Sequence, residues 1–294
     1  MLPPELIKKI RQIHIKSGRI VNDLMAGQYK SVFRGFGIEF EEVREYYAGD
    51  EVKSIDWKVS ARRGRPYVKR YREERELLVM LLVDMSASVG FGTTEALKKE
   101  IAVEVAAILA FSAIRNNDKV GVIIFTDHVE KYIPPQKGAA HVWRVIKEIY
   151  TFEPVRKKTD IQSAIIYLGR VCRKRRALSF LISDYLADDF TDRLKIANKR
   201  HEFIGVLISD PGDFSLPGGG LLLVEDFETG RQFFLDAFHR PTRRRYEKRR
   251  QAEYARNKEI LKSAAIDCVE ISTVASVSDA LMAYFRYRER IRRQ

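Results

Sequence analysis

Three oxygen-bearing side chains occur at alternate positions directly after an apolar segment of this sequence. Residues 77–83 form a continuous apolar run, and Asp84, Ser86 and Ser88 follow it. In an extended turn, alternate side chains point the same way, so these three oxygens can meet on one side of the chain. Groups of this kind can bind a cation, or they can satisfy the backbone of a turn.

Two further oxygen-bearing residues lie at the ends of predicted elements later in the chain. Thr159 precedes a predicted helix that begins near residue 161, and Asp184 follows a predicted strand at residues 178–182. If the strand ends converge, the set contains two carboxylates and three hydroxyls, with no His or Cys. Oxygen ligands of this kind favour a hard cation, Mg²⁺ or Mn²⁺, over zinc or copper.

The neutral hydroxyls determine what such a site could do. A cation held mainly by hydroxyls keeps much of its positive charge, and Mg²⁺ prefers six ligands, some of which are waters. One coordination position therefore stays open for a carboxylate from another molecule. The residues predict a metal site that can bind a carboxylate of another molecule.

The predicted elements bring these residues to one edge of a sheet. Strand-like and helical segments alternate from residue 77 onward, which is typical of a mostly parallel sheet with helices on both faces. The strands are expected at residues 77–83, 120–125, 129–133, 178–182, 203–208 and 268–271. Ligands of such sheets bind at the carboxyl ends of the strands. We therefore expect an α/β fold with a doubly wound, mostly parallel sheet.

The spacing of the five residues resembles a known metal site. Asp84-x-Ser86-x-Ser88, followed by Thr159 and Asp184, is similar to the metal-ion-dependent adhesion site of von Willebrand factor A domains. The resemblance covers about residues 77–294 and implies a von Willebrand A, Rossmann-like fold. In the arrangement expected from it, the three hydroxyls coordinate the metal, and the two aspartates act largely through bound waters.

The N-terminal segment resembles a bacterial family called domain of unknown function 58. The similar stretches, identified by their residue letters, are GIEF at 37–40, REY at 44–46, GD at 49–50, IDW at 55–57 and AR at 61–62. In that family such a segment precedes a von Willebrand A-like domain. The resemblance implies a protein-binding function beside a MoxR-type AAA+ ATPase, in chaperone-like assembly or maturation of client proteins, and no enzymatic activity.

The two resemblances predict two parts of the chain. Residues 1–76 are expected to form an α+β extension that begins with an amphipathic helix at residues 4–25. Residues 77–294 are expected to form the von Willebrand A-like domain, with a hairpin insertion near 213–237. The sequence contains no apolar stretch of the roughly 18 residues that a membrane span needs, and only two cysteines, so a cytoplasmic protein is expected.

Composition leaves two other functions open. The net charge of +13 suggests nucleic acid or an anionic membrane as a partner, although both signs of charge are interspersed along most of the chain. A strongly basic segment at residues 240–250 favours a solvated helix face or contact with an acidic patch on a protein. A metal-dependent hydrolase that uses the same aspartates is a further alternative, but no general base is evident near them.

Each of the five site residues also has a purely structural interpretation. Asp84, Ser86 and Ser88 could cap the following helix or satisfy a turn. Thr159 could be the N-cap of the helix that begins near residue 161, and that function is compatible with metal binding. Asp184 could be an ordinary turn residue at the end of a strand.

Overall fold

The computed structural model describes Tyr29, Val32, Phe33 and residues 37–74, 76–226 and 230–293. These residues group into two compact units. The smaller unit is Phe33–Leu77, and the larger one contains residues 78–294 together with Tyr29 and Val32. The amphipathic helix predicted at residues 4–25 lies outside the described residues.

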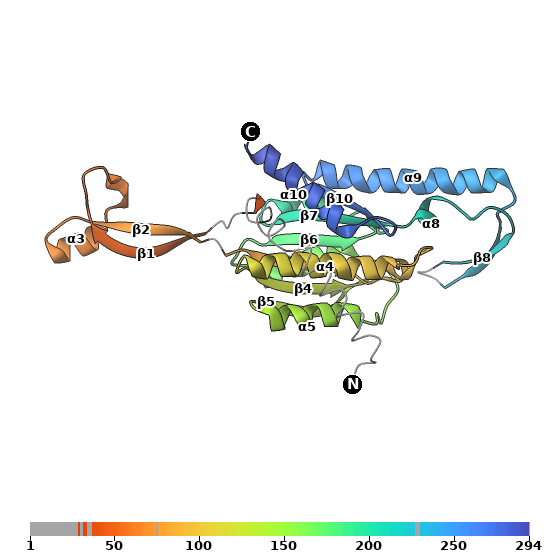
Figure 1. The fold of residues 1–294 in the computed structure, drawn as a ribbon, viewed down its shortest axis with the longest axis horizontal. Coiled ribbons are helices and arrows are strands. Elements are labelled where there is room, and N and C mark those ends of the chain that lie inside the picture. The colour runs from red at the N-terminus through yellow and green to blue at the C-terminus, as the bar shows by residue number, and fades with distance from the viewer. Residues whose placement is uncertain (1–28, 30–31, 34–36, 75, 227–229, 294) are drawn as a thin grey trace. The chain divides into compact units, whose positions relative to one another are not determined.

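The larger unit is built on a six-stranded sheet with the strand order β10-β7-β6-β3-β4-β5 (Figure 1). All neighbouring pairs are parallel except β4 and β5. The strands are β3 (Leu78–Asp84), β4 (Lys119–Phe125), β5 (Val129–Gln136), β6 (Leu178–Ser183), β7 (Glu202–Ser209) and β10 (Asp267–Ser272). The predicted doubly wound, mostly parallel sheet is therefore confirmed. The antiparallel edge strand β5 contains Pro134 and Pro135, residues that sheets tolerate mainly at their edges.

The central strand β3 is covered on both faces. Its residues from Val79 to Asp84 are buried without alternation, which is typical of a parallel strand between two helical layers. One layer consists of α4 (Lys98–Arg115), α5 (Ala139–Tyr150) and α10 (Val277–Arg293). The other consists of α6 (Ile161–Val171), α7 (Thr191–Asn198) and α9 (Arg240–Ser263). The helix α4 is itself almost entirely buried, because it packs against the sheet and also against α5 and α10.

The chain order creates a switch point beside β3. The connection from β3 through α4 leads to β4 on one side, whereas β6 lies on the other side of β3. Helices on either side of such a point diverge, and ligands bind in the space that this leaves at the carboxyl ends of the strands. The residues that end or follow β3 and β6 are Asp84 and Asp184, so both aspartates lie at the switch point.

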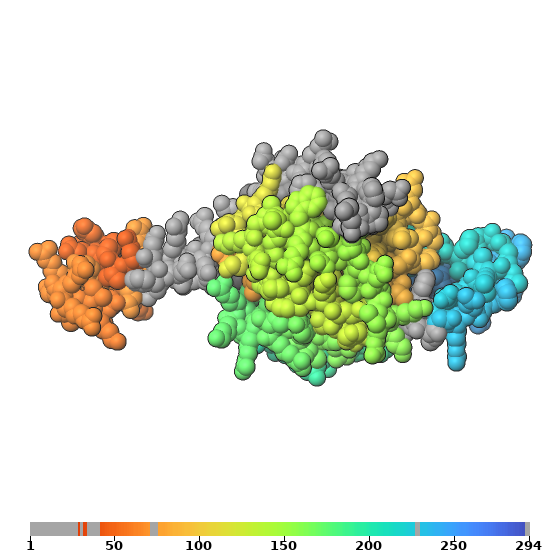
Figure 2. All heavy atoms as spheres, turned by 90° about the horizontal axis from the view of Figure 1, so that it is seen from below, coloured from red at the N-terminus to blue at the C-terminus, as the bar shows by residue number. Residues whose placement is uncertain are grey.

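Two short elements and a hairpin complete the larger unit. The 3-10 helix η3 (Ala87–Gly90) follows β3, and the one-turn helix α8 (Pro211–Phe214) follows β7. Strands β8 (Leu221–Glu225) and β9 (Gln232–Asp236) pair as an antiparallel hairpin, which stands out from the layered part of this unit (Figure 2). No helix among the described residues is long and apolar enough to cross a membrane.

The smaller unit is a twisted antiparallel pair with short helices. Strand β1 (Gly37–Glu45) pairs with β2 (Tyr67–Glu74), and the connection contains η2 (Val52–Ser54) and α3 (Trp57–Arg63). The Asp56 side chain caps α3 by accepting hydrogen bonds from the backbone N–H groups of Lys58 and Val59. Arg44 holds the turn after β1 through two hydrogen bonds to the carboxylate of Asp50.

Candidate metal site

Asp84 is the last residue of β3, and its side chain is completely buried. One carboxylate oxygen accepts a hydrogen bond from the backbone N–H of Ser86 at 2.8 Å. The other accepts one from the hydroxyl of Ser183, at the end of the neighbouring strand β6, at 2.6 Å. Asp84 therefore stabilises the local turn, as its structural interpretation requires, and it also joins the ends of two strands at the switch point.

Ser86 and Ser88 present their hydroxyls together. Their Oγ atoms lie 3.2 Å apart, although the segment was expected to be extended and Ser88 instead lies in the 3-10 helix η3, which Ser86 precedes. Ser86 is the N-cap residue of η3, but its side chain makes no capping hydrogen bond. The turn is held instead by Asp84 and by the backbone, so helix capping does not explain the two hydroxyls.

Thr159 reaches the same region from the loop before α6. Two backbone hydrogen bonds fix this loop: one from Ala87 N–H to the carbonyl of Lys157, and one from Asp160 N–H to the carbonyl of Thr126. The N-cap of α6 is Asp160, whose side chain accepts from Ser163 N–H, and not Thr159. Thr159 and Ser88 line one groove, so the structure brings the threonine beside the serine turn.

Asp184 follows β6 and is also buried, with an exposed fraction of 5%. One of its oxygens accepts a hydrogen bond from Leu186 N–H. The next residue, Tyr185, has a left-handed backbone with φ of 57°, which is unusual for a bulky side chain. Hydrogen bonds hold this residue in place, because its N–H donates to Ser183 Oγ and its hydroxyl to the carbonyl of Leu181.

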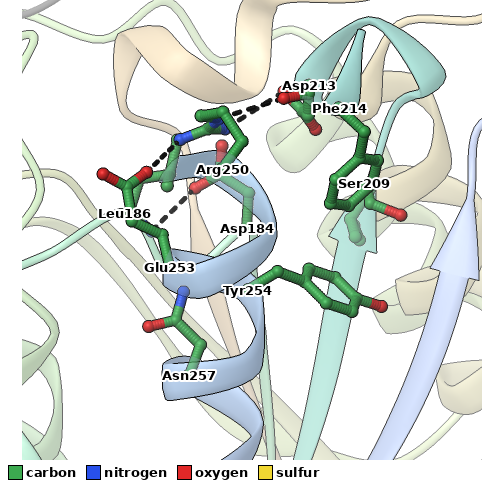
Figure 3. Close-up of a pocket in the computed structure, with 10 residues that line it drawn as sticks. Asp184, Leu186, Ser209, Asp213, Phe214, Arg250, Glu253, Tyr254 and Asn257 are labelled. Atoms are coloured by element: carbon green, nitrogen blue, oxygen red, sulfur yellow. Dashed lines mark hydrogen bonds and ion pairs between the residues drawn. The ribbon is translucent and has the colours of Figure 1, made fainter. Parts of the chain in front are cut away.

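A buried ion-pair network, which the sequence pattern did not predict, lies behind Asp184. The ammonium of Lys98, at the start of α4, lies 3.2 Å from Asp184 and 2.8 Å from Asp213. Asp213 also pairs with Arg250 of α9 at 3.4 Å, and Arg250 pairs with Glu253 at 2.9 Å (Figure 3). The cavity beside these groups has a volume of about 20 Å³, enough for about one water molecule.

The sequence does contain a weak signal for this network. Lys98 lies on the same face of α4 as Ala102, Val105 and Leu109, all of which are buried. A lysine inside the apolar stripe of a helix is rarely buried unless an acidic partner accompanies it. The partner Asp213 is 115 residues away and follows a different strand, so the pattern along α4 could not identify it.

Two buried carboxylates and one buried ammonium set the electrostatics of the site. Burial, together with the negative charge of Asp184, raises the pKa of the Asp84 carboxyl to about 7. Burial alone would lower the pKa of Lys98, but Asp184 and Asp213 outweigh that effect and raise it. The positive charge of Lys98 therefore offsets part of the negative charge of Asp184 and of Asp213, which lies on α8. The hydroxyls of Ser86 and Ser88 lie on the serine turn that follows Asp84.

The five predicted residues fit a hydroxyl-rich divalent site. Within the described ranges no group of three or more His, Cys, Asp or Glu side chains could hold a metal. The set at the switch point has only two carboxylates, and its remaining donors would be hydroxyls and water. That composition suits Mg²⁺ or Mn²⁺, which bind oxygen ligands and retain waters. Ser86, Ser88 and Thr159 would coordinate the cation, and Asp84 and Asp184 would supply negative charge.

A groove opens in front of the site. Its volume is about 540 Å³, and it extends from Ser88 and Thr159 to the side of α9. Leu186 and Asn257 also line it, and Asn257 donates a hydrogen bond to the carbonyl of Tyr185 at 3.0 Å. A metal ion held by the serine turn could therefore be reached by a side chain of another molecule.

Comparison with known proteins identifies the family to which this chain belongs. The family described as "Protein of unknown function DUF58" matches residues 42–256. The uncharacterized protein Rv1480 of Mycobacterium tuberculosis is 31% identical over 238 residues, which cover 79% of this chain and 75% of that protein.

Solved structures with a similar arrangement have low sequence identity. The conserved hypothetical protein BatB from Bacteroides thetaiotaomicron is 16% identical with a TM-score of 0.49, over 73% of this chain and 99% of that one. The SpRpn10 von Willebrand A domain is 12% identical with a TM-score of 0.44, over 70% and 94% of the two chains. A mussel byssus protein with a zinc-occupied adhesion-site motif is 16% identical with a TM-score of 0.38, over 46% and 38%. The chain belongs to the DUF58 family of proteins of unknown function, and its larger unit has an α/β fold built on a mostly parallel six-stranded sheet.

Proposed function

We propose that the larger unit is a Mg²⁺-dependent protein-interaction module. The observation that carries the proposal is the position of the Asp84–Ser86–Ser88 turn. It lies at the switch point of the sheet beside Asp184, and it opens into a groove that Thr159 also lines. Two buried carboxylates beside hydroxyls that line a groove suit a cation that must still accept a ligand from outside.

The mechanism follows from the charges of the ligands. Because the hydroxyls are neutral, a bound divalent cation stays electron-poor and attracts an anionic oxygen strongly. An Asp or Glu of a partner protein would fill the open position from the groove. Because Lys98 offsets the charge of Asp184, the two aspartates of the site would not neutralise the cation completely. Binding of the partner would then require the metal.

The partner proposed for this module is a MoxR-type AAA+ ATPase, with the module acting as its adaptor in the maturation of client proteins. This part of the proposal depends on the resemblance of the N-terminal segment and of the adhesion-site residues to their families. Copurification of the full chain with an ATPase of that type would support it. Repeated isolation of other partners without such an ATPase would contradict it.

The test is capture of partners from native lysate by the full chain, with Mg²⁺ and with EDTA. Asp84→Asn keeps the shape of the buried side chain but removes its charge, and Asp192→Asn makes the same change at an exposed aspartate of α7 that is outside the groove lining. We expect one partner to be retained only with Mg²⁺, by the wild type and Asp192→Asn but not by Asp84→Asn. A partner that is indifferent to both metal and Asp84 would contradict the proposal.

A further inference from the structure

The groove in front of the site has a cationic lining on two sides. Lys157 and Lys158 contribute from the loop that carries Thr159, and Arg249, Arg250 and Arg256 contribute from α9. The backbone of Lys157 is tied to the serine turn by the hydrogen bond from Ala87 N–H, at 3.0 Å. This hydrogen bond holds the loop that carries both lysines against the serine turn.

The five cations differ in what they already bind. Arg249 pairs with Glu253 at 2.9 Å, and Arg250 is committed to Asp213 and Glu253. Lys157, Lys158 and Arg256 are exposed, and within the described part of the chain none of them is in an ion pair. These three charges are available to a ligand that lies in the groove.

We propose that the groove binds an acidic peptide segment of the partner. One Asp or Glu of the segment would coordinate the metal at Ser86 and Ser88. Neighbouring acidic residues would pair with Lys157 and Lys158 on one side and with Arg256 on the other. This inference rests on the proposed function, and it adds the chemical class of the partner: a segment that carries several carboxylates rather than only one.

The acidic residues of the groove argue for a peptide rather than a nucleic acid. Asp188, Asp226 and Glu253 line the same groove as the cations. A phosphate backbone carries a charge at every nucleotide and would meet these carboxylates as well as the cations. A peptide can place its acidic residues opposite the cations only. The aromatic ring in the lining, that of Tyr185, is buried with 1% exposure and offers no platform for base stacking.

The test measures binding of a fluorescein-labelled hexaglutamate peptide to the full chain by fluorescence anisotropy, at physiological ionic strength, with excess Mg²⁺ and with EDTA. The groove variants are Lys158→Ala and Arg256→Ala. The matched control is Lys248→Ala, an exposed cation of α9 outside the groove lining. Exposed ion pairs are individually weak, so we expect each groove variant to weaken Mg²⁺-dependent binding about two- to fivefold, and Lys248→Ala to leave it unchanged.

The outcomes separate this inference from the function on which it rests. Binding that needs Mg²⁺ and Asp84 but is unaffected in both groove variants would overturn the acidic groove and leave the metal-dependent module standing. Mg²⁺-dependent binding that persists in Asp84→Asn would overturn the proposed site. Equal weakening in Lys248→Ala, absence of Mg²⁺-dependent binding, or preferential displacement of the peptide by duplex DNA would each overturn the peptide assignment.

Discussion

The ammonium of Lys98 lies 3.2 Å from the carboxylate of Asp184, and both side chains are buried. The same ammonium lies 2.8 Å from Asp213, which is in turn paired with Arg250 of α9. An aspartate of the candidate metal site is thereby joined, through one buried cation, to the helix that forms the far side of the groove. The site and α9 are therefore joined by buried ion pairs, in addition to lining the same groove.

Replacement of Lys98 by Met should destabilise the larger unit strongly. The variant leaves Asp184 and Asp213 buried with less compensation, and breaking a buried ion pair costs about 3–5 kcal/mol. A bound cation would compensate Asp184, so we expect saturating Mg²⁺ to restore part of the loss. The measurement is the free energy of unfolding in denaturant, with Mg²⁺ and with EDTA.

Lys99→Met is the matched control for Lys98. The Lys99 ammonium is half-buried and donates to the carbonyl of Phe152. Its replacement should cost about 1 kcal/mol or less. Equal losses in the two variants, or a loss in Lys98→Met that Mg²⁺ does not reduce, would show that Lys98 is not coupled to the metal site.

The affinity for Mg²⁺ should depend on pH through Asp84. Burial first, and the charge of Asp184 second, raise the pKa of Asp84 to about 7, while Lys98 faces Asp184 from α4. Below that pH the cation must displace a proton, so its affinity should fall about tenfold per pH unit and level off above about pH 7. Titration calorimetry at about pH 5.5 and about pH 8 measures the effect. An affinity that does not change between them would contradict it.

The same pKa predicts how the metal-free protein responds to pH. The folded-state pKa of Asp84 lies above the value of about 4 in the unfolded chain, so the folded state binds more protons between about pH 4 and about pH 7. The contribution of this group to stability is therefore fully present below about pH 4 and is lost as the pH rises through 7. In EDTA, Asp84→Asn should show a smaller fall in the free energy of unfolding over this window than the wild type.

Two serines of β6 provide a matched pair. Ser183 donates to Asp84 at 2.6 Å and accepts from Tyr185 N–H at 2.8 Å, whereas the buried Ser179 hydroxyl has no hydrogen-bond partner among the described residues. Ser183→Ala should lower the free energy of unfolding by about 1–3 kcal/mol and weaken Mg²⁺ binding. Ser179→Ala should leave stability unchanged or raise it. The reverse order, measured by denaturant unfolding, would contradict the assigned hydrogen bonds.

Gly205 of β7 makes room for the residue that follows Asp184. A Cβ atom at this position would lie 2.8 Å from the Tyr185 hydroxyl and 2.9 Å from Leu261. Overpacking of this kind costs about 1–3 kcal/mol, so Gly205→Ala should destabilise the fold and, by shifting Tyr185, weaken Mg²⁺ binding. Gly169→Ala on α6 is the control, because a Cβ there meets nothing within 4 Å. Equal stability of the two variants would contradict the tight contact.

The sheet could be predicted because its central strands occur in the sequence as continuous apolar runs, which are typical of strands covered on both faces. The run at residues 77–83 overlaps β3 and the segment at 178–182 lies within β6, and their parallel pairing brings Asp84 next to Ser183. The position of Asp84, Ser86, Ser88 and Asp184 could be predicted from a local rule, that polar residues after parallel strands gather at one edge. Thr159 precedes α6 and follows no strand, so this rule does not cover it. Metal binding by these five residues stays a prediction.

The network behind the site could not be predicted in the same way. Lys98, Asp213 and Arg250 come from three elements that are remote in sequence, and their contacts depend on how α4, α8 and α9 pack. Residues 240–250 were expected to form a solvated face or to contact an acidic patch on a protein. Arg250 instead is largely covered and pairs within the unit, because the short helix α8 brings Asp213 to it. Tertiary packing decides which charged residues of a helix become buried, and helical periodicity alone does not reveal that packing.

The central claim is that the Asp84–Ser86–Ser88 turn holds a divalent cation, and titration calorimetry with Mg²⁺ and Mn²⁺ on the purified full chain tests it most directly. The account predicts one binding event per chain in the wild type and in Asp192→Asn. Binding should be lost in Asp84→Asn and weakened in Ser86→Ala and Thr159→Val. Wild-type protein that is folded and binds neither cation, or binding that is equal in the wild type and Asp84→Asn, would contradict the claim.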